Sequence, residues 1–305
     1  MNRLEFHISY TCVNDCIFCS ESDRMKRYKK YPVSFLEIKK VLAAKRKTGF
    51  EFVNFTGGEP TLHPNFIEIV KFAKRIGYRT YIGTNGTMLA RPDFCEKAAP
   101  FLDEISLSIH GYNNSTHDGL VKRKGAFKDI VRAIKNLDEL EFKNKFANVV
   151  AIGKNSAYLE KILIFLINNG FKQVLFSNTA PEGNGLKNFK ELEIRISAWK
   201  KIILKLKKIS EKSDTPIRFF GLPICALNGA ISLSNDIYWD ARMTIEKSLE
   251  KKRRIILTEI KDLIPDRNRG KISACKNCPY QKLCFGAFNE YVKNFGQNEL
   301  KFAQL

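Results

Sequence analysis

Short apolar runs alternate with longer segments of helical periodicity along the first 176 residues of the chain. The apolar runs predict strands at residues 4–10, 52–56, 79–83, 104–109, 148–152 and 173–176. Apolar positions at helical spacing predict helices at residues 33–47, 64–76, 92–98, 127–140 and 157–168. The first of these helices also carries Ser34 at its N-cap and Glu37 three residues later, the pattern of a capping box. One strand–helix unit is therefore repeated along the chain.

Several of the predicted strands are continuously apolar, as expected for strands that are buried on both faces. Strands of this kind that alternate with helices form a parallel sheet with right-handed crossovers. Six such strands predict an α/β fold whose sheet curves into an open, partial (β/α)6 barrel of the TIM type, rather than a closed barrel of eight strands. In barrels of this type the loops at the carboxyl ends of the strands carry the chemistry, so we expect the functional residues there.

The pattern changes after residue 183. Gly183 to Gly185 marks a boundary, which precedes a Lys-rich amphipathic helix expected at residues 188–208 and a strand expected at 217–222. We therefore predict a barrel at residues 1–183, a linking helix at 184–214 and a small C-terminal domain at 215–305.

The chain is strongly basic, with 52 Lys and Arg residues against 32 Asp and Glu residues and a formal net charge of +20. This charge suggests an acidic partner, such as RNA, an acidic peptide or an acidic electron carrier. The alternative is that lysines simply cover the solvated faces, since they are scattered and no single stripe of aromatic residues interleaves with them. The sequence has no long uncharged apolar run, so we expect no membrane span and a cytoplasmic protein.

Eight Cys residues in a chain without a signal peptide favour metal binding over disulfides. Cys12, Cys16 and Cys19 form a C-x-x-x-C-x-x-C array directly after the first predicted strand. Three thiolates so close together suit an iron–sulfur cluster, and three ligands on a four-iron cluster leave one iron open. A structural zinc site with His7 as the fourth ligand stays open as an alternative.

A second motif, Gly57-Gly58-Glu59-Pro60, follows the predicted strand at 52–56. With both motifs in this order, the chain resembles the radical S-adenosylmethionine (SAM) superfamily. That family has the same cysteine loop after its first strand, with an aromatic residue before the third Cys, here Phe18, and a GGE-type motif after its second strand. The resemblance covers residues 4–179 and implies the partial barrel that the periodicity also predicts.

A second set of thiols, Cys275, Cys278 and Cys284, lies near the end of the chain, with Cys225 fifty residues upstream. Four thiolates can enclose either an iron–sulfur cluster or a structural zinc. The arrangement resembles the auxiliary-cluster domains of radical SAM enzymes, called SPASM with two clusters and Twitch with one. Because no Cys follows Cys284, the resemblance implies one auxiliary cluster, and Cys225 is either its fourth ligand or a free thiol. Cys95 is expected in the core.

The resemblance also implies a chemistry. A 4Fe–4S cluster on the first cysteine loop would bind SAM and reduce it to methionine and a 5′-deoxyadenosyl radical, which abstracts hydrogen from the substrate. Residues Gly57 to Pro60, with Glu59, would hold the methionyl amine, and Phe18 would pack against the adenine or the cluster. The other residues implied in the SAM pocket are Asn85, Ser108, Asn148 and Asn178. His110 and Cys225 are the candidate catalytic residues. Polar turns that only serve the loops are the alternative interpretation for the strand-end residues.

The resemblance to auxiliary-cluster enzymes also implies a class of substrate. The auxiliary cluster favours modification or oxidation of a peptide, as in the maturation of ribosomally made peptides. No leader-recognition segment precedes the first strand, which weakens that prediction if recognition must lie in the same chain. RNA, a nucleotide or a small metabolite is the alternative substrate, and flavodoxin or ferredoxin is the expected electron donor. The alternative of another class is a non-catalytic, metal-binding protein that binds nucleic acid.

Overall fold

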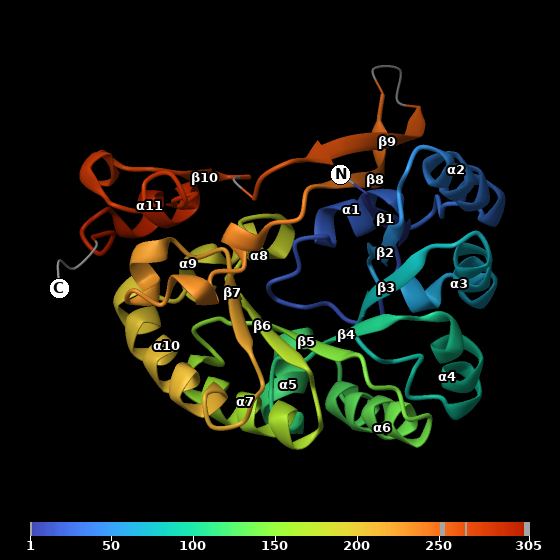
Figure 1. Ribbon diagram of the computed structural model, residues 1–305, viewed down its shortest axis with the longest axis horizontal. Coiled ribbons are helices and arrows are strands. Elements are labelled where there is room, and N and C mark those ends of the chain that lie inside the picture. The colour runs from blue at the N-terminus through green and yellow to red at the C-terminus, as the bar shows by residue number, and fades with distance from the viewer. Residues whose placement is uncertain (1, 251–253, 266, 302–305) are drawn as a thin grey trace.

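A curved, largely parallel sheet organises the computed structural model, which describes residues 2–250, 254–265 and 267–301 (Figure 1). Within these residues the sheet has nine strands in the order β7-β6-β5-β4-β3-β2-β1-β8-β9. The strands are β1 (Arg3–Ser9), β2 (Phe52–Gly57), β3 (Arg79–Thr84), β4 (Glu104–Ser108), β5 (Lys145–Val150), β6 (Gln173–Ser177), β7 (Ile217–Phe220), β8 (Arg242–Leu249) and β9 (Ile255–Asp262). All neighbours pair in parallel except β8 and β9.

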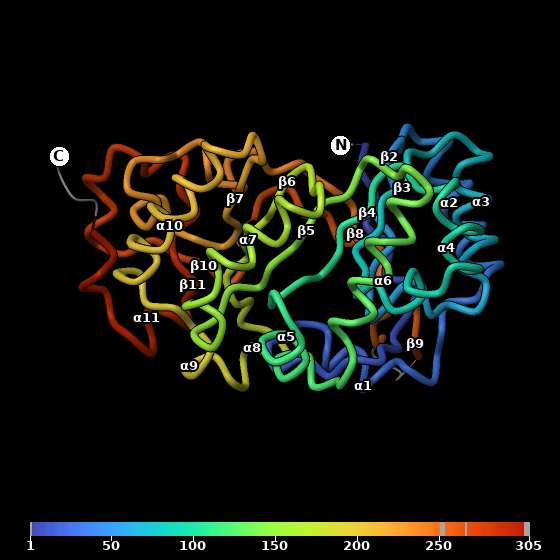
Figure 2. Tube along the Cα trace, turned by 90° about the horizontal axis from the view of Figure 1, so that it is seen from below, coloured from blue at the N-terminus to red at the C-terminus, as the bar shows by residue number. Residues whose placement is uncertain are grey.

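Helices cover the convex side of the sheet (Figure 1). They are α2 (Phe35–Lys47), α3 (Phe66–Arg75), α4 (Pro92–Ala98), α6 (Ala126–Glu139), α7 (Leu159–Asn168) and α10 (Ile196–Ser210). Figure 2 shows a second group of short helices along one edge of the molecule. These are α1 (Ser22–Tyr28), α5 (Asn114–Val121), α8 (Gly183–Lys187) and α9 (Phe189–Leu192). This second group follows the carboxyl ends of strands and frames the site.

The partial barrel expected from the sequence is confirmed, and the six expected strands are its β1 to β6. The sheet continues further than expected, because β7 joins one edge while β8 and β9 extend the other. The expected helix at 188–208 is wrong at its start, since α10 begins only at Ile196. The carbonyl of Leu192 accepts a hydrogen bond from Gly153 N (2.7 Å), which ties that residue to the β5–α7 loop.

Strand β1 shows why the barrel interior is polar. Leu4, Phe6 and Ile8 are fully buried in the main core. The alternate residues Glu5 and His7 instead meet charged groups from α1 and β8 on the opposite face. Because successive side chains of a strand point to opposite faces, one strand serves both the core and the interior of the barrel.

The C-terminal part is small and lies beside the barrel, at the upper left of Figure 1. It comprises β10 (Arg269–Gly270), β11 (Ala287–Phe288) and α11 (Asn289–Phe295), and the two strands pair antiparallel. Arg269 joins this part to the rest of the chain, because its guanidinium donates to Asp236 Oδ2 at 2.8 and 2.7 Å. The predicted division at residues 183 and 215 stays a prediction. None of the helices in the described part of the chain is long and apolar enough to cross a membrane.

Candidate functional site

A cavity of about 180 Å³ lies at the carboxyl ends of β1 to β5. Figure 1 shows the dark-blue loop between β1 and α1, the cysteine loop (residues 10–20), crossing the middle of the view. The cavity is lined by Cys12, Asn14, Cys16, Phe18, Cys19, Ser20, Met25, Gly58, Glu59, Gly83, Thr84, Asn85, Ser108, His110, Asn148 and Val150. Both sequence motifs therefore face one space.

Main-chain contacts join the GGEP loop (residues 57–60) to the cysteine loop. Gly58 N donates to Ser9 O and Glu59 N donates to Thr11 O, both at 2.8 Å. Gly57 has φ of +120°, and a Cβ atom there would stand 2.1 Å from Ser9 O. A Cβ on Gly58 would stand 2.5 Å from Thr11 O. The two glycines are required because no larger residue lets the loops approach this closely.

The three thiols of the cysteine loop form a suitable ligand set. Burial raises the pKa of Cys16, and the neighbouring thiols Cys19 and Cys12 raise it further. Burial likewise raises the pKa of Cys19, to about 12. Thiolates crowded in this way are stabilised by a positively charged metal centre, which deprotonates its ligands. Cys12 Sγ also accepts hydrogen bonds from Asn14 N (3.4 Å) and Asn85 Nδ2 (3.5 Å), contacts typical of cluster-ligating sulfur.

The zinc alternative would use His7 as a ligand, but in this structure two carboxylates hold His7. His7 Nδ1 lies 3.3 Å from Glu21 Oε2, and Nε2 lies 3.8 Å from Glu5 Oε1. Burial opposes a charge on His7, but the two carboxylates outweigh it and raise its pKa to about 10. A protonated imidazole cannot ligate a metal.

Glu59 is buried at the base of the cavity, and protein donors fix its carboxylate. Oε1 accepts from Thr61 N (3.1 Å), Thr61 Oγ1 (2.5 Å) and Thr84 Oγ1 (2.7 Å). Oε2 accepts from Asn85 N at 2.7 Å. Burial raises the pKa of Glu59, and these donors oppose that rise. Oε2 therefore keeps capacity for one further donor, since each carboxylate oxygen has two lone pairs.

His110 and Phe18 form the side wall of the cavity. Their rings pack edge to face with centroids 4.7 Å apart. His110 Nδ1 accepts from Val150 N (3.1 Å), and burial lowers the pKa of His110 well below its usual value. The ring is therefore neutral and carries its proton on Nε2. Ser108 and Asn148 also line the cavity, and Asn148 Oδ1 accepts from Ser177 Oγ at 2.7 Å.

Asn178 is not among the residues that line this cavity. Its Nδ2 donates to Glu193 Oε1 (2.9 Å) and faces Gly221 O (3.4 Å), in the buried region between β6 and β7. Glu193 Oε2 has no hydrogen-bond partner among the described residues. Burial raises the pKa of Glu193 to about 8. A neutral, protonated Glu193 therefore belongs to the folded state near neutral pH.

The stability of the protein is expected to fall as pH rises from about 5 to 8, because unfolded Glu193 loses its proton near 4.5 whereas folded Glu193 holds it to about 8. A single group of this kind contributes up to about 1.4 kcal/mol per pH unit. Glu193→Gln should remove the Glu193 contribution to this slope, measured as the difference between the thermal midpoints at pH 5.5 and 8. The exposed Glu191→Gln is the control and should keep the slope. Parallel pH profiles for the wild type and Glu193→Gln would contradict the expectation.

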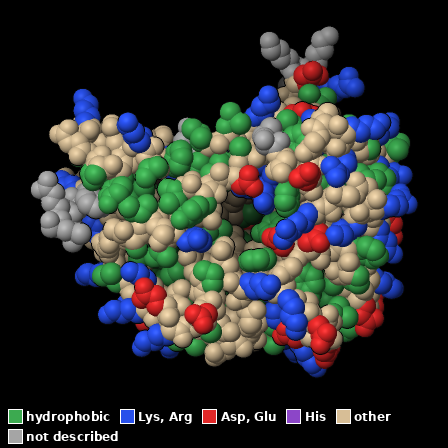
Figure 3. All heavy atoms as spheres, in the orientation of Figure 1, with side chains coloured by type: hydrophobic (Ala, Val, Ile, Leu, Met, Phe, Trp, Pro, Cys, Tyr) green, Lys and Arg blue, Asp and Glu red, His purple; other side chains and the backbone are tan. Residues whose placement is uncertain are grey.

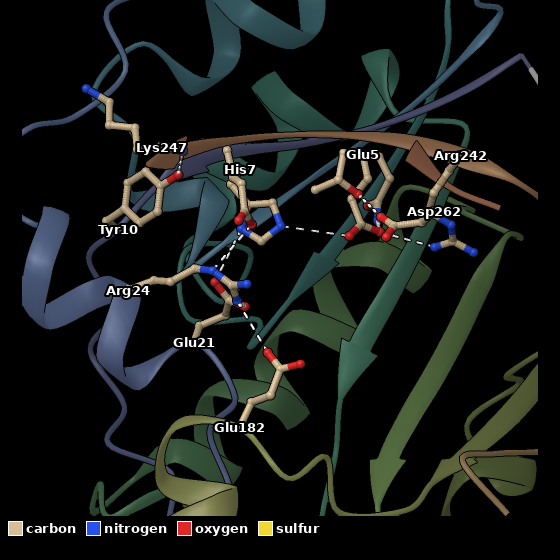
Figure 4. A network of polar contacts seen from close by, with 12 residues as sticks. Glu5, His7, Tyr10, Glu21, Arg24, Glu182, Arg242, Lys247 and Asp262 are labelled. Carbon is tan, nitrogen blue, oxygen red and sulfur yellow. Dashed lines mark hydrogen bonds and ion pairs between the residues drawn. The ribbon is translucent and has the colours of Figure 1, made fainter. Parts of the chain in front are cut away.

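Sequence reasoning missed a network of charged side chains that anchors the end of the cysteine loop (Figure 4). Glu21, two residues after Cys19, faces His7 on β1 and accepts from Arg24 Nη1 at 2.7 Å. Arg24 also lies 3.7 Å from Glu182 and 3.3 Å from Glu246. The network therefore joins the loop to β1, α1, β8 and the start of α8.

The same network continues along β1 to the far edge of the sheet. Glu5 lies 3.1 Å from Arg242 on β8, and the Tyr10 hydroxyl accepts from Lys247 N at 2.6 Å (Figure 4). The alternation of Glu5 and His7 with apolar residues was the sequence signal that marks them as facing the interior. Figure 3, drawn in the orientation of Figure 1, shows a hollow near the centre of the view, with acidic and basic side chains at its rim.

The second set of cysteines also converges. Cys225, Cys275, Cys278 and Cys284 line one cavity of about 340 Å³, between η4 (Ile224–Leu227) and η7 (Ser273–Asn277). Cys284 Sγ accepts from Ile224 N (3.4 Å) and Gly286 N (3.3 Å). Burial raises the pKa of Cys225 to about 12, and neighbouring Cys284 contributes to the rise. Cys95, in contrast, is fully buried in the main core on α4, as expected.

The chain is similar in sequence to known proteins. The sequence model described as "Radical SAM superfamily" matches residues 6–166. A Saccharolobus islandicus protein named "Probable GTP 3′,8-cyclase" is 28% identical over 196 residues, which are 63% of this chain and 61% of that protein. The mycofactocin maturase MftC of Mycolicibacterium smegmatis is 25% identical over 182 residues, which are 60% of this chain and 45% of MftC. The chain thus matches about three-fifths or less of these relatives' length.

Two solved structures share the fold over nearly the whole chain. Streptococcus suis SuiB bound to S-adenosylmethionine has a TM-score of 0.67 and 14% identity, covering 99% of this chain and 76% of SuiB. The structure of anSMEcpe with bound AdoMet has a TM-score of 0.66 and 16% identity, covering 98% of this chain and 93% of anSMEcpe.

Proposed function

The chain belongs to the radical SAM superfamily, and from this premise we propose that the cavity at the cysteine loop holds a 4Fe–4S cluster and SAM. The observation that carries the proposal is that Cys12, Cys16 and Cys19 line one cavity with Gly58 and Glu59. Members of this superfamily are enzymes that use both groups, so the alternative of a non-catalytic, metal-binding protein for nucleic acid is wrong.

Different residues of the cavity would bind the cluster and SAM. The three thiolates would ligate three irons and leave the fourth for the amino and carboxylate groups of SAM. When bound, the two groups supply one-electron cleavage of SAM and a radical that takes hydrogen from the substrate. Glu59 Oε2, with one lone pair free, would accept from the methionyl amine. Phe18 would pack against the adenine or the cluster.

The remaining polar residues would fix the nucleoside. Ser108 and Asn148 lie on neighbouring strands and face the same cavity, which suits contacts to the ribose hydroxyls. Asn85 contacts Cys12 Sγ and so would tune the cluster. Neutral His110 would donate from Nε2 and supply no positive charge at the site. Asn178, which contacts Glu193 instead, would help to position the β6–β7 region.

The substrate we propose is a peptide that the radical modifies or oxidises. The proposal is supported by the similarity to a maturase, MftC, and by a fold shared over nearly the whole chain with SuiB, which has been solved bound to its precursor peptide SuiA. A nucleotide is the second candidate, favoured by the match to a probable GTP 3′,8-cyclase. Substrate-dependent transfer of deuterium from a labelled peptide or from labelled GTP into 5′-deoxyadenosine would separate the two.

We also propose an auxiliary 4Fe–4S cluster on Cys225, Cys275, Cys278 and Cys284. Four thiols lining one cavity match the number of ligands that encloses such a cluster. The main-chain donors at Cys284 Sγ would stabilise the negative charge on the cluster. Its role would be to bind the substrate or to accept an electron from the product radical. An acidic carrier such as flavodoxin or ferredoxin would supply the electron that starts the reaction.

Replacement of Cys225 tests whether it is the fourth ligand. In a background that lacks Cys12, Cys16 and Cys19, the chain should bind about four irons per molecule. Cys225→Ala in this background should lose most of that iron on gel filtration, or show a changed electron paramagnetic resonance spectrum. Cys95→Ala, a buried thiol away from both cavities, is the control. An unchanged iron content and spectrum in Cys225→Ala would show that Cys225 is a free thiol.

The main proposal is tested on anaerobically reconstituted protein. The unmodified chain is expected to contain about eight irons, two four-iron clusters. With dithionite as the reductant it should convert SAM to methionine and 5′-deoxyadenosine. Zinc as the sole metal after anaerobic reconstitution, or the absence of 5′-deoxyadenosine, would overturn the proposal.

A further inference from the structure

A second hollow adjoins the cysteine loop, between that loop and α1. Its volume is about 290 Å³. It is lined by Tyr10, Thr11, Cys12, Asp15, Ser22, Met25, Lys26 and Lys29. Cys12 and Met25 also line the proposed SAM cavity. The hollow therefore reaches a proposed cluster ligand from a side that the SAM cavity does not use.

The rim of this hollow is basic. Lys26 and Lys29 are three positions apart and so lie on the same side of α1 and its C-cap, both exposed. Arg27 and Lys30 extend the exposed basic segment. The nearby carboxylates face other lysines, since Asp15 lies 3.9 Å from Lys122 and Asp23 pairs with Lys187. Among the described residues these four cations form no ion pair with a carboxylate within 4.0 Å, although Asp23 attracts Lys26 and Arg27 electrostatically.

The cysteine loop, part of which lines the hollow, also carries an exposed apolar residue. Val13 is 43% exposed. The loop is held from beneath by α5, because Asp15 N donates to Val121 O and Ile17 N donates to Leu120 O, both at 3.0 Å. Figure 2 shows α1 and α5 along the same edge of the molecule. A basic hollow whose loop also exposes an apolar residue suits contact with an acidic protein.

We propose that this hollow, with Lys26, Arg27, Lys29 and Lys30 at its rim, binds a small acidic protein that carries one electron. The proposal rests on the proposed function, since it requires a cluster on the cysteine loop. In the transfer the carrier loses one electron and the cluster gains it, and no atom moves. The basic rim steers the carrier by its charge, and the hollow lets its redox group approach Cys12 without entering the SAM cavity.

Charge reversal at the rim tests this assignment in the reconstituted holoenzyme. With a reduced, acidic flavodoxin as the probe, Lys26→Glu/Lys29→Glu is expected to form 5′-deoxyadenosine at least about ten-fold more slowly at low ionic strength. With dithionite, a small reductant that needs no docking surface, the same variant should match the wild type within about two-fold. At about 0.5 M salt the flavodoxin-driven rates should converge, because the charges are then screened.

The matched control is Lys201→Glu/Lys208→Glu, which makes the same change of net charge on exposed positions of α10. Figure 1 shows α10 on the side of the barrel away from α1. This control should keep its flavodoxin-driven rate. An equal loss in both variants would overturn the proposal, since total charge alone would then explain it. A loss with dithionite as well would also overturn it, because the lysines would then serve the SAM or substrate site.

A binding measurement separates this proposal from the proposed function. Oxidised flavodoxin needs no turnover to bind, so its dissociation constant can be compared between the wild type and Lys26→Glu/Lys29→Glu. At least about ten-fold weaker binding in the variant supports the docking face. Equal binding overturns it, whereas failure of the wild type to cleave SAM with dithionite overturns the proposed function alone.

Discussion

Replacement of Cys12, Cys16 and Cys19 together by Ala is expected to remove about half of the iron and to slow SAM cleavage by at least about 10³-fold. The loss should be this large because the cofactor supplies the radical chemistry, and no other residue of the cavity can take the place of a thiolate. The measurements are iron content per chain and 5′-deoxyadenosine formed with dithionite. The remaining iron, about four atoms, would then belong to the auxiliary site.

The control for this variant must remove a thiol without touching a cluster. Cys95→Ala does so, since Cys95 is fully buried on α4 within the main core. It should keep its full iron content and its rate of SAM cleavage. If the triple variant retained both clusters or any substantial rate, the assignment of the cysteine loop would fail.

Asp236→Asn is expected to destabilise the protein by about 3–5 kcal/mol, because it removes the Asp236 carboxylate from a buried ion pair with Arg269. The Asp236 and Arg269 side chains are 3% and 1% exposed, and Arg269 also lies over the Phe220 and Phe288 rings at 5.7 and 5.2 Å. This pair connects β10 to the barrel beside β7. The thermal midpoint should therefore fall by about 5–8 °C.

The measurement belongs at pH 8, because burial raises the pKa of Asp236 to about 6 in spite of the nearby Arg269. The control is Asp240→Asn, the same substitution in an exposed pair in which Arg3 Nε lies 2.8 Å from Asp240. Exposed pairs contribute about 0–1 kcal/mol, so the control should change the midpoint by about 2 °C or less. Equal shifts in the two variants would show that the buried pair does not hold the C-terminal part.

The main residues of the first site were predictable because they lie in two short stretches of the sequence. Cys12, Cys16 and Cys19 fall on one loop, and Gly57 to Pro60 follows the next strand, so neighbouring parallel strands bring them to the same edge. Glu59, Asn85, Ser108, His110 and Asn148 all line the cavity as expected for strand-end residues. Asn178 follows a strand in the same way, yet its amide turns towards Glu193. Position at a strand end does not fix where a side chain points.

The helices α1 and α5 were missed for a different reason. Both are short and carry few apolar residues, so neither shows a helical period. The signal for α5 was local: Asn113 accepts from Thr116 N at 2.9 Å, and the Thr116 side chain returns to the Asn113 backbone. These two helices matter because they hold the cysteine loop from both sides.

The sequence by itself determined the repeated strand–helix units, the positions of both cysteine sets and the glycines that let two loops meet, because each depends on periodicity or on residues close together in the chain. Only the tertiary structure decided how distant segments complete the site. It placed β8 beside β1 across more than two hundred residues, brought Cys225 to the second cysteine set and joined Glu21 to His7, Arg24 and Glu246. Such contacts are set by the packing of the whole sheet and leave no local pattern.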